Sequence, residues 1–422
     1  MALTKKPVTG MRDILPAEMQ VREYVMNQIR ETYRSFGFTQ VETPCVEHIE
    51  NLTSKQGGDN EKLIFKILKR GKKLSSALEA EAPTEQTLAD MGLRYDLTLP
   101  LSRYYANNRN DLMNPFKVIQ MDRVYRAERP QKGRLREFMQ CDIDILGEPT
   151  NLAEIELILA TTTLLGKLDF KNFTIRINDR RILKAMAAYS GFPEESLDQV
   201  FITLDKMDKI GLDGVEAELL ELGYDENSVK TYLELMDTVT KDAAGVRMLG
   251  EKLADTLPKS VTDNLAYIMD TVTDVAETKF GLVFDPTLVR GMSYYTGTIF
   301  EVSMEGFGGS VAGGGRYDKM IGKFTGVDTP ACGFSIGFER IVTILLDQEN
   351  HIQSSIPKKA YLIEKGMDAS RMCQIMKQAM EERRDGVQVL VSQMNKNKKF
   401  QKEQLNKEGY TDFVEFYREA LK

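Results

Sequence analysis

The sequence predicts an α+β protein with a helical middle section and a small α/β unit near its C-terminal end. Two adjoining stretches between Phe116 and Gly147 alternate apolar and polar residues with the period of two that strands require. Residues 182–279 instead carry apolar and acidic residues at helical spacing, with little strand signal. Beyond Pro357, strand-like and helix-like segments follow one another in a unit with room for about three strands.

The remaining elements follow from periodicity and from the residues that punctuate it. The first helix is expected over 16–36, because apolar residues recur on one face and Gly37 follows its end. A helix at 99–107, a helix at 152–168 and a strand turning into a helix at 333–346 are expected on the same grounds. Strands are expected at 38–44, 64–68, 94–98, 173–178, 282–284 and 297–304, and in the last unit at 360–364, 387–391 and 411–417, with helices at 367–384 and 396–407.

Composition limits the class of protein. The chain has 422 residues, of which 28% are charged and 42% hydrophobic, so it can form several domains with full cores. Its net charge of −7 means that contact with nucleic acid would depend on local basic patches. The four cysteines lack metal-ligand spacing and are expected to be buried in a reducing compartment, without a metal site in the protein. The start lacks a signal peptide's apolar core, so a soluble cytoplasmic protein is expected.

The stretch 116–147 is the most informative segment, because its polar residues fall on one face of a predicted hairpin. In its second strand, polar and aromatic side chains share one parity, and mostly apolar residues share the other. That polar face is carried by Arg136, Phe138, Gln140, Asp142 and Asp144. A solvated face is the alternative explanation. The density of arginine in this hairpin favours a site for phosphates or carboxylates instead.

Four further segments fit a binding site, and each also has a simpler explanation. Residues 288–297 (LVRGMSYYTG) join an arginine to two tyrosines, which solvation and packing would also explain. The glycines at 313–315 can cradle a phosphate or allow close strand packing. Asp96 and Thr98 can share a strand face and hold an amine, or cap a helix. The basic run 396–402 can contact nucleic acid or form a solvated helix face.

Together and in this order, the motifs resemble those of the histidyl-tRNA synthetases, a class II aminoacyl-tRNA synthetase family, over essentially the whole chain. The hairpin is similar to the family's motif 2, in which an Arg-x-Glu precedes a loop and a Phe follows it. In this chain these residues are Arg126, Glu128 and Phe138. GFSIGFER, ending in Arg340, is similar to motif 3. LVRGMSYYTG and AGGGRYD resemble the family's two histidine signatures.

The resemblance implies a fold and a reaction. The fold is an antiparallel class II synthetase sheet flanked by helices. Residues 1–181 (motifs 1 and 2) and 280–350 (histidine motifs and motif 3) would form the catalytic core, 182–279 the helical insertion, and 357–422 a shortened anticodon-binding-like α/β domain. The reaction joins L-histidine to ATP as histidyl-adenylate, releases pyrophosphate, and transfers histidine to the 3′ end of tRNA(His). Mg²⁺ is expected on the ATP phosphates, and a homodimer is implied.

The resemblance also implies roles for individual residues. Fixed cations would stabilise charge on the α-phosphate and pyrophosphate, and the implied catalytic residues are Arg126, Arg290 and Arg340. The implied ATP-binding residues are Arg126, Glu128, Arg134, Phe138 and Arg340. An acid with a tyrosine suits the paired nitrogens of imidazole, and the implied histidine-binding residues are Asp96, Thr98, Gln140, Asp144, Arg290, Tyr294, Tyr295 and Tyr317. Contacts with tRNA are expected from Arg129, Gln131, Lys396, Lys398 and Lys399.

Two departures from the family pattern bear on function. Ser293 stands where the family usually has an acidic residue, which removes a possible partner of Arg290. The C-terminal unit is also shorter than usual, so reduced anticodon contact is expected, with 396–402 as the remaining tRNA surface. The alternative function is a histidine-sensing regulatory paralogue of the synthetase, of the ATP phosphoribosyltransferase regulatory subunit type. Retention of Arg126, Arg290 and Arg340 favours the enzyme.

Overall fold

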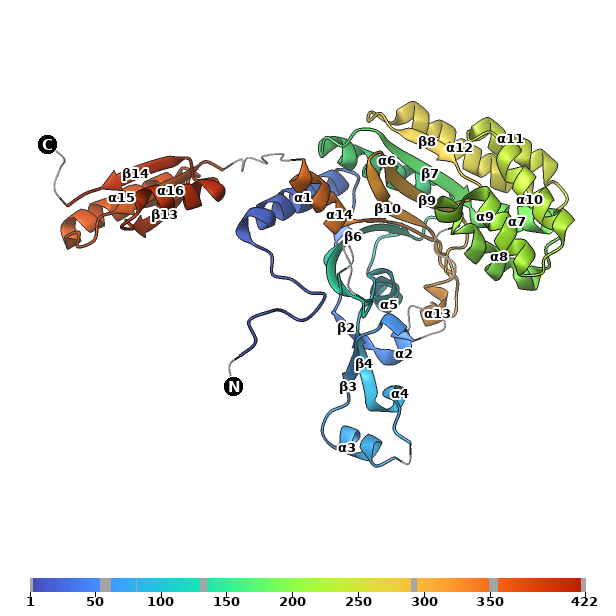
Figure 1. Ribbon diagram of the computed structural model, residues 1–422, viewed down its shortest axis with the longest axis horizontal. Helices are drawn as coiled ribbons and strands as arrows, with labels where there is room; N and C mark the ends of the chain where they lie inside the picture. The colour runs from blue at the N-terminus through green and yellow to red at the C-terminus, as the bar shows by residue number, and fades with distance from the viewer. Residues whose placement is uncertain are drawn as a thin grey trace. The chain divides into compact units, whose positions relative to one another are not determined.

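A computed structural model of the chain describes residues 3–53, 62–80, 82–129, 135–289, 294–348 and 356–418. The chain divides into two compact units, residues 1–12 with 27–341 and residues 13–26 with 342–422. The helices within the described ranges include none that is both long and apolar enough to cross a membrane. The predicted α+β class is confirmed, because a large, mostly antiparallel sheet carries helices on its faces and at one end (Figure 1).

The first unit is built on an eight-stranded sheet with the order β1-β5-β6-β11-β10-β9-β7-β8. The middle strands pair antiparallel, whereas the pairs β1–β5 and β7–β8 at the two edges are parallel. The strands are β1 (Thr39–Gln40), β5 (Phe116–Tyr125), β6 (Glu137–Leu146), β11 (Ala331–Ile336), β10 (Phe307–Arg316), β9 (Thr298–Met304), β7 (Phe173–Asp179) and β8 (Gly281–Phe284). The predicted hairpin 116–147 is therefore confirmed as β5 and β6, which are adjacent strands between β1 and β11.

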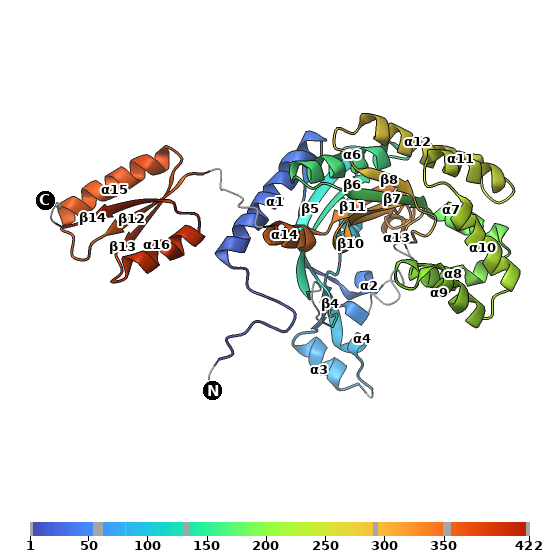
Figure 2. The same ribbon diagram turned by 45° about the horizontal axis from the view of Figure 1, so that its top comes forward.

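The two faces of the sheet are covered differently. Cys141, Ile143 and Ile145 of β6 are buried on one face, as their parity predicts. Helix α6 (Leu152–Lys167) packs over β6 and β11 (Figure 2). On the side of Tyr317, the helix α5 (Thr98–Asn108) adds Leu101 to a core cluster with the sheet. The helices α1 (Pro16–Ser35) and α14 (Phe338–Asp347) lie close to their predicted positions.

A small second sheet corrects part of the prediction for residues 64–98. Its order is β2-β4-β3, with β2 (Val46–His48), β4 (Ala89–Leu93) and β3 (Lys66–Leu68). The strand expected at 94–98 is wrong: β4 ends at Leu93, and Thr98 already begins α5. After β3 the chain forms the helix α3 (Lys72–Leu78), which the sequence did not predict. Short helices complete this part of the chain as α2 (Ile49–Leu52), α4 (Glu85–Leu88) and, after β10, α13 (Gly322–Thr325).

The helical middle section is confirmed, and it lies beyond the β7–β8 edge of the sheet (Figures 1 and 2). Acidic side chains cap several of its helices: Asp225 accepts from the Ser228 amide and Asp242 from the Gly245 amide. The helices are α7 (Arg180–Tyr189), η2 (Glu194–Ser196), α8 (Leu197–Leu204), α9 (Met207–Glu221), α10 (Glu226–Thr238), α11 (Ala243–Lys252) and α12 (Lys259–Val275).

The second unit contains a three-stranded parallel sheet in the order β13-β12-β14, as the C-terminal pattern predicts. Its strands are β12 (Lys358–Ile363), β13 (Gln388–Gln393) and β14 (Asp412–Phe416), and its helices are α15 (Ala369–Arg384) and α16 (Lys398–Lys407). The expectation that all cysteines are buried is wrong for Cys373, which is exposed on α15, whereas Cys141 and Cys332 are buried.

Candidate active site

The polar face of the β5–β6 hairpin lies within rows of side chains that cross the sheet. Gln120 of β5 stands opposite Asp142 of β6, and Asp142 stands opposite Ser335 of β11. One row further, Asp144 stands opposite Gly333. Gln120, Asp142 and Asp144 are only 2%, 3% and 3% exposed. A solvated face is therefore wrong for these residues, whose polar groups are buried.

Asp144 and three tyrosines come together at one end of this face. The Tyr317 hydroxyl donates to Asp144 Oδ1 at 2.6 Å. The rings of Tyr294 and Tyr295 are 4.3 Å apart with their hydroxyls 3.1 Å from each other, and Tyr294 packs edge-on against Tyr317 at 6.3 Å. A Cβ on Gly333 would overlap the Asp144 carboxylate, so only glycine leaves that space. The fold thus joins residues that are distant in sequence into one aromatic, acid-bearing cluster.

Burial raises the pKa values of two side chains in this cluster, Asp144 and Tyr317. Burial raises the pKa of Asp144 to about 7, although the hydrogen bond from Tyr317 opposes the rise and the charge of Asp96 adds to it. Burial and the charge of Asp144 likewise raise the pKa of Tyr317. An acid that titrates near neutrality beside tyrosine hydroxyls can accept a hydrogen bond from a ring N–H and adapt its protonation to the ligand.

The residues expected to hold an amine border the same carboxylates. Asp96 lies in the loop before α5, where its Oδ1 accepts from the Leu99 amide at 3.1 Å, so the capping alternative also applies to it. Burial raises the pKa of Asp96, while the Leu99 amide and Arg126 lower it. Thr98 begins α5. Gln140 donates through Nε2 to Asp142 Oδ2 at 2.8 Å. Asp96 and Gln140 thus approach one carboxylate cluster from a loop and a strand.

The residues expected to bind ATP lie toward the other end of the hairpin. The Arg126 guanidinium lies 5.1 Å from the centre of the Phe138 ring, and its Nε donates to the Tyr95 carbonyl at 3.0 Å. The Glu128 carbonyl accepts from Arg136 Nε at 2.9 Å. Arg340 of α14 reaches across to β10 and donates to the Ser310 carbonyl. The Phe138 ring, on which a base could stack, and the Arg126 cation therefore lie together on the hairpin that also carries Asp144.

Glu339 has specific partners that the sequence did not predict. Its Oε1 accepts from the Met139 amide at 3.0 Å, and its Oε2 lies 3.6 Å from Arg12 Nη2. The Arg136 amide in turn donates to the Gly10 carbonyl at 2.7 Å. The N-terminal GMRD segment and motif 3 are thereby fastened to the β6 strand.

Four residues singled out by the sequence lie outside the described residues. Arg290 and Ser293 fall between Val289 and Tyr294, and Gln131 and Arg134 fall in the turn between β5 and β6. Their roles remain predictions. Val289 is buried and its carbonyl accepts from Arg180 at 3.2 Å, which fixes the chain immediately before Arg290.

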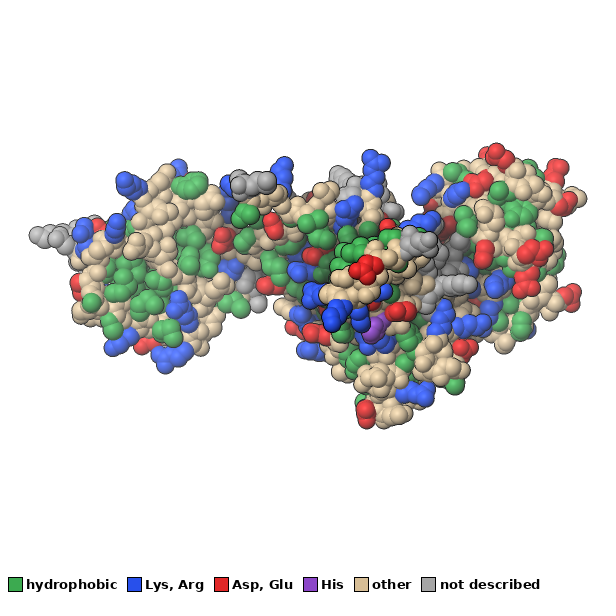
Figure 3. All heavy atoms as spheres, turned by 90° about the horizontal axis from the view of Figure 1, so that it is seen from below, with side chains coloured by type: hydrophobic (Ala, Val, Ile, Leu, Met, Phe, Trp, Pro, Cys, Tyr) green, Lys and Arg blue, Asp and Glu red, His purple; other side chains and the backbone are tan. Residues whose placement is uncertain are grey.

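The residues expected to contact tRNA differ in their exposure and in whether they already form ion pairs. Arg129 is exposed after β5, and Lys396 and Lys399 are exposed in the second unit. Lys398 is instead held by Glu415 at 2.8 Å and by the Tyr417 hydroxyl at 2.7 Å, and Lys402 also pairs with Glu415 at 2.6 Å. In the first unit, basic and acidic side chains are interspersed on the face in Figure 3, so positive charge is local there.

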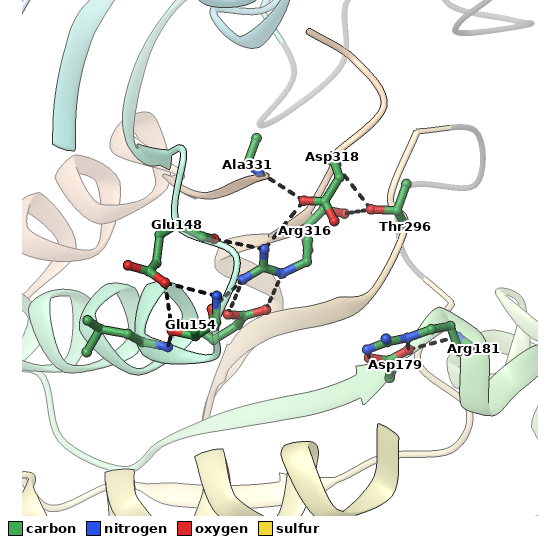
Figure 4. A network of polar contacts seen from close by, with 10 residues as sticks. Glu148, Glu154, Asp179, Arg181, Thr296, Arg316, Asp318 and Ala331 are labelled. Carbon is green, nitrogen blue, oxygen red and sulfur yellow. Dashed lines mark hydrogen bonds and ion pairs between the residues drawn. The ribbon is translucent and has the colours of Figure 1, made fainter. Parts of the chain in front are cut away.

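The glycine run at 313–315 belongs to the sheet rather than to a phosphate loop. It forms part of β10, and a Cβ on Gly314 would overlap the Gly333 carbonyl of β11. Close strand packing, the simpler explanation, therefore holds. At the end of this strand, Arg316 makes a bidentate pair with Glu154 at 2.7 and 2.6 Å and also donates to the Glu148 and Thr150 carbonyls (Figure 4). Neither Arg316 nor Glu154 was anticipated.

Comparison with known proteins points to one family. The family model described as histidyl-tRNA synthetase matches residues 10–341. A histidine--tRNA ligase of Leifsonia xyli is 46% identical over 350 residues, covering 82% of this chain and 81% of that protein. A probable histidine--tRNA ligase of Tropheryma whipplei is 43% identical, covering 85% and 83%, and a histidine--tRNA ligase of Bacteroides fragilis is 37% identical, covering 82% and 78%.

Solved structures agree on the fold. The histidyl-tRNA synthetase of Nostoc sp. PCC 7120 superposes with a TM-score of 0.78 at 26% identity, covering 97% of this chain and 90% of that one. An ATP phosphoribosyltransferase regulatory subunit/histidyl-tRNA synthetase from Bacillus halodurans gives a TM-score of 0.78 over the full length of both chains. Its 21% identity shows a shared fold alone.

Proposed function

The chain belongs to the histidyl-tRNA synthetase family, and from that premise we propose that it is a histidine--tRNA ligase. It activates L-histidine with ATP to histidyl-adenylate and pyrophosphate, then transfers histidine to the 3′ end of tRNA(His). The single observation that carries this proposal is the buried Asp144, bonded to Tyr317 beside the Tyr294–Tyr295 pair. We assign 1–181 and 280–350 to the catalytic core, 182–279 to the insertion and 357–422 to tRNA contact.

Histidine would bind at the cluster of Asp144 and the three tyrosines, with its imidazole toward Asp144. Asp144 accepts a hydrogen bond from one ring nitrogen, and Tyr295 faces the other, with Tyr294 and Tyr317 against the ring. An aliphatic substrate of the same size would offer no N–H to Asp144 and no ring nitrogen to a tyrosine hydroxyl, so it would lose the hydrogen bonds that select imidazole. The α-ammonium would lie toward Asp96, Thr98 and Gln140, and the carboxylate toward Arg290.

ATP would bind beside the histidine site. Phe138 stacks on adenine, the Glu128 carboxylate accepts from its amino group, and Arg126, Arg134 and Arg340 hold phosphates. A histidine carboxylate oxygen bonds to the α-phosphorus while the bond to pyrophosphate breaks. The charge that develops on both groups is stabilised by cations fixed beforehand, because such groups need no reorganisation during the reaction. Positioning of the two substrates lowers the remaining barrier.

Mg²⁺ would accompany ATP and neutralise its phosphates. This ion prefers oxygen ligands and binds through one or two carboxylates together with substrate phosphates. Among the residues of the described ranges, no group of three or more His, Cys, Asp or Glu side chains forms a cage for a metal.

In the second step, a hydroxyl of the terminal adenosine attacks the histidyl carbonyl carbon and AMP leaves. Arg129 and Gln131, at the end of the β5–β6 hairpin, would approach the acceptor end of tRNA. Lys396, Lys398 and Lys399 would contact tRNA from the C-terminal unit, with Lys398 partly neutralised by Glu415. We further propose a cytoplasmic homodimer.

Histidine-dependent exchange between ATP and pyrophosphate, followed by charging of tRNA(His), tests the function. We expect both activities, and an Arg290→Ala variant should lose exchange. Histidine binding without exchange, under conditions where ATP binds, would contradict the ligase and favour the histidine-sensing regulatory paralogue. Removal of residues 357–422 should reduce charging more than exchange, and an equal loss of both would contradict the role assigned to that unit.

A further inference from the structure

Asp142 lies among the polar residues of this sheet face, but the proposed function assigns it no role. It stands between Gln120 and Ser335 in one row, and between Gln140 and Asp144 along its own strand. Its side chain is 3% exposed. Oδ2 accepts from Gln140 Nε2 at 2.8 Å, and the Ser335 side chain opposite is close enough to lower the pKa of Asp142, whereas Oδ1 is buried without a hydrogen bond of good geometry. A carboxylate oxygen in that position calls for a donor.

Asp142 determines which way the Gln140 amide faces. A carboxylate only accepts hydrogen bonds, so the amide must present its nitrogen to Asp142 Oδ2. The Gln140 carbonyl oxygen then points elsewhere, and it too is buried and without a donor. Gln120 behaves in the same way, because its Nε2 donates to the Leu97 carbonyl at 2.9 Å and leaves Oε1 buried and unpaired.

Three buried acceptor atoms on one patch of the sheet therefore lack a hydrogen-bond donor: Gln120 Oε1, Gln140 Oε1 and Asp142 Oδ1. Three acids, Asp96, Asp142 and Asp144, also meet at this patch, and burial raises the pKa of each because it disfavours the charged form. The charges of Asp144 and Asp96 raise the pKa of Asp142 further after burial has raised it, while Ser335 and Gln140 oppose the rise. A primary ammonium group offers three N–H donors and one positive charge, which complements both the acceptors and the acids.

We propose that Asp142 is the central residue of the α-ammonium site, binding the substrate ammonium through Oδ1 while Oδ2 holds the Gln140 amide so that its carbonyl faces the same group. This inference rests on the proposed function and deepens it. It divides the labour between two neighbouring acids of β6: Asp142 recognises the amine, and Asp144 recognises the ring. An amino acid that carries both an α-ammonium and an imidazole ring is selected, because the ammonium cannot replace the ring N–H at Asp144 and the ring cannot replace the ammonium at Asp142.

Substrate analogues separate this role from a structural one. The full-length Asp142→Asn variant keeps the shape and an acceptor for Gln140 but loses the charge. We would measure binding of histidine, of histidinol (which keeps the ammonium and ring) and of 3-(imidazol-4-yl)propionate (which lacks the ammonium) by calorimetry. Histidine and histidinol should bind about 10- to 100-fold more weakly to the variant, the range expected for a lost charged hydrogen bond. The propionate should change by no more than about twofold.

Glu137→Gln is the matched control. Glu137 lies on the same strand but on the face opposite to Gln140 and Asp142, and its ion pair with Arg123 is long, at 3.5 Å. It should leave all three affinities unchanged. Equal weakening of all three ligands in Asp142→Asn, or histidine affinity equal to wild type, would overturn the inference. In the latter case Asp142 is a neutral acid that donates to Gln120. A wild-type protein that binds none of the ligands would contradict the proposed function instead.

Discussion

Two buried polar clusters in the same sheet differ in whether their hydrogen bonds are complete. The guanidinium of Arg316, at the end of β10, has an acceptor for every nitrogen: Glu154, two carbonyls, and Asp318 at 3.4 Å. The Asp142 cluster, two strands away, keeps three buried acceptors without donors. A completed cluster stabilises the fold, whereas an incomplete one costs stability until a ligand arrives. This contrast separates scaffold from site.

The completed cluster should respond to mutation through stability. Burial alone would lower the pKa of Arg316, but its bonds to Glu154 outweigh that and raise it. Glu154→Ala removes the bidentate carboxylate from a buried guanidinium and should lower the free energy of unfolding by about 3 kcal/mol, measured by urea denaturation. The control is Glu156→Ala on the same helix, whose pair with Lys117 is more exposed (side chains 27% and 26% exposed) and should contribute about 1 kcal/mol or less. Equal losses in the two variants would erase the distinction between the clusters.

The incomplete cluster should respond through function. Asp144→Asn keeps an acceptor for Tyr317 but removes the charge that faces the ring. We expect kcat/KM for histidine in pyrophosphate exchange to fall about 100-fold, or roughly 2.7 kcal/mol, while KM for ATP changes little. The midpoint of urea unfolding near pH 8 should stay the same or rise, because a buried charge has been removed. A variant that is less stable but fully active would contradict the assignment.

The pH dependence of stability sharpens the same contrast. The pKa of Asp144 is raised to about 7, so the folded protein holds a proton that the unfolded chain releases near pH 4. The resulting stability is fully present at low pH and is lost as pH rises through about 7. Between pH 5 and 8, wild type should therefore lose about 2 kcal/mol relative to Asp144→Asn. A constant difference in unfolding free energy across this range would contradict the raised pKa.

The smallest effect is expected at the exposed pairs of the second unit. Lys398 and Lys402 share Glu415 at the surface. Lys398→Ala should change the unfolding free energy by less than about 1 kcal/mol. If Lys398 contacts tRNA as proposed, the variant should still raise KM for tRNA in charging, and exposed Lys399→Ala should do so at least as strongly. Unchanged KM in both variants would remove this helix from the tRNA surface.

Prediction from sequence was most successful where a local pattern is long and regular. The β5–β6 hairpin and the helical section 182–279 were recognised because many residues repeat one period. The short apolar-polar alternation of segment 94–98 predicts a strand, because it does not reveal that Asp96 accepts a hydrogen bond from the Leu99 amide and that α5 begins at Thr98. Short segments follow their tertiary partners more than their own propensity.

The sequence by itself determined the family, the hairpin and the parity that places Gln140, Asp142 and Asp144 on one face. Parity says which residues share a face, but not how deeply that face is buried or what lies opposite. Only the tertiary structure placed Gln120 across from Asp142 and brought Tyr317 to Asp144 across 173 positions of the chain. Burial, hydrogen-bond partners and the charges of other strands decide whether a carboxylate is solvated, paired or waiting for a ligand, and these are long-range properties that no local pattern contains.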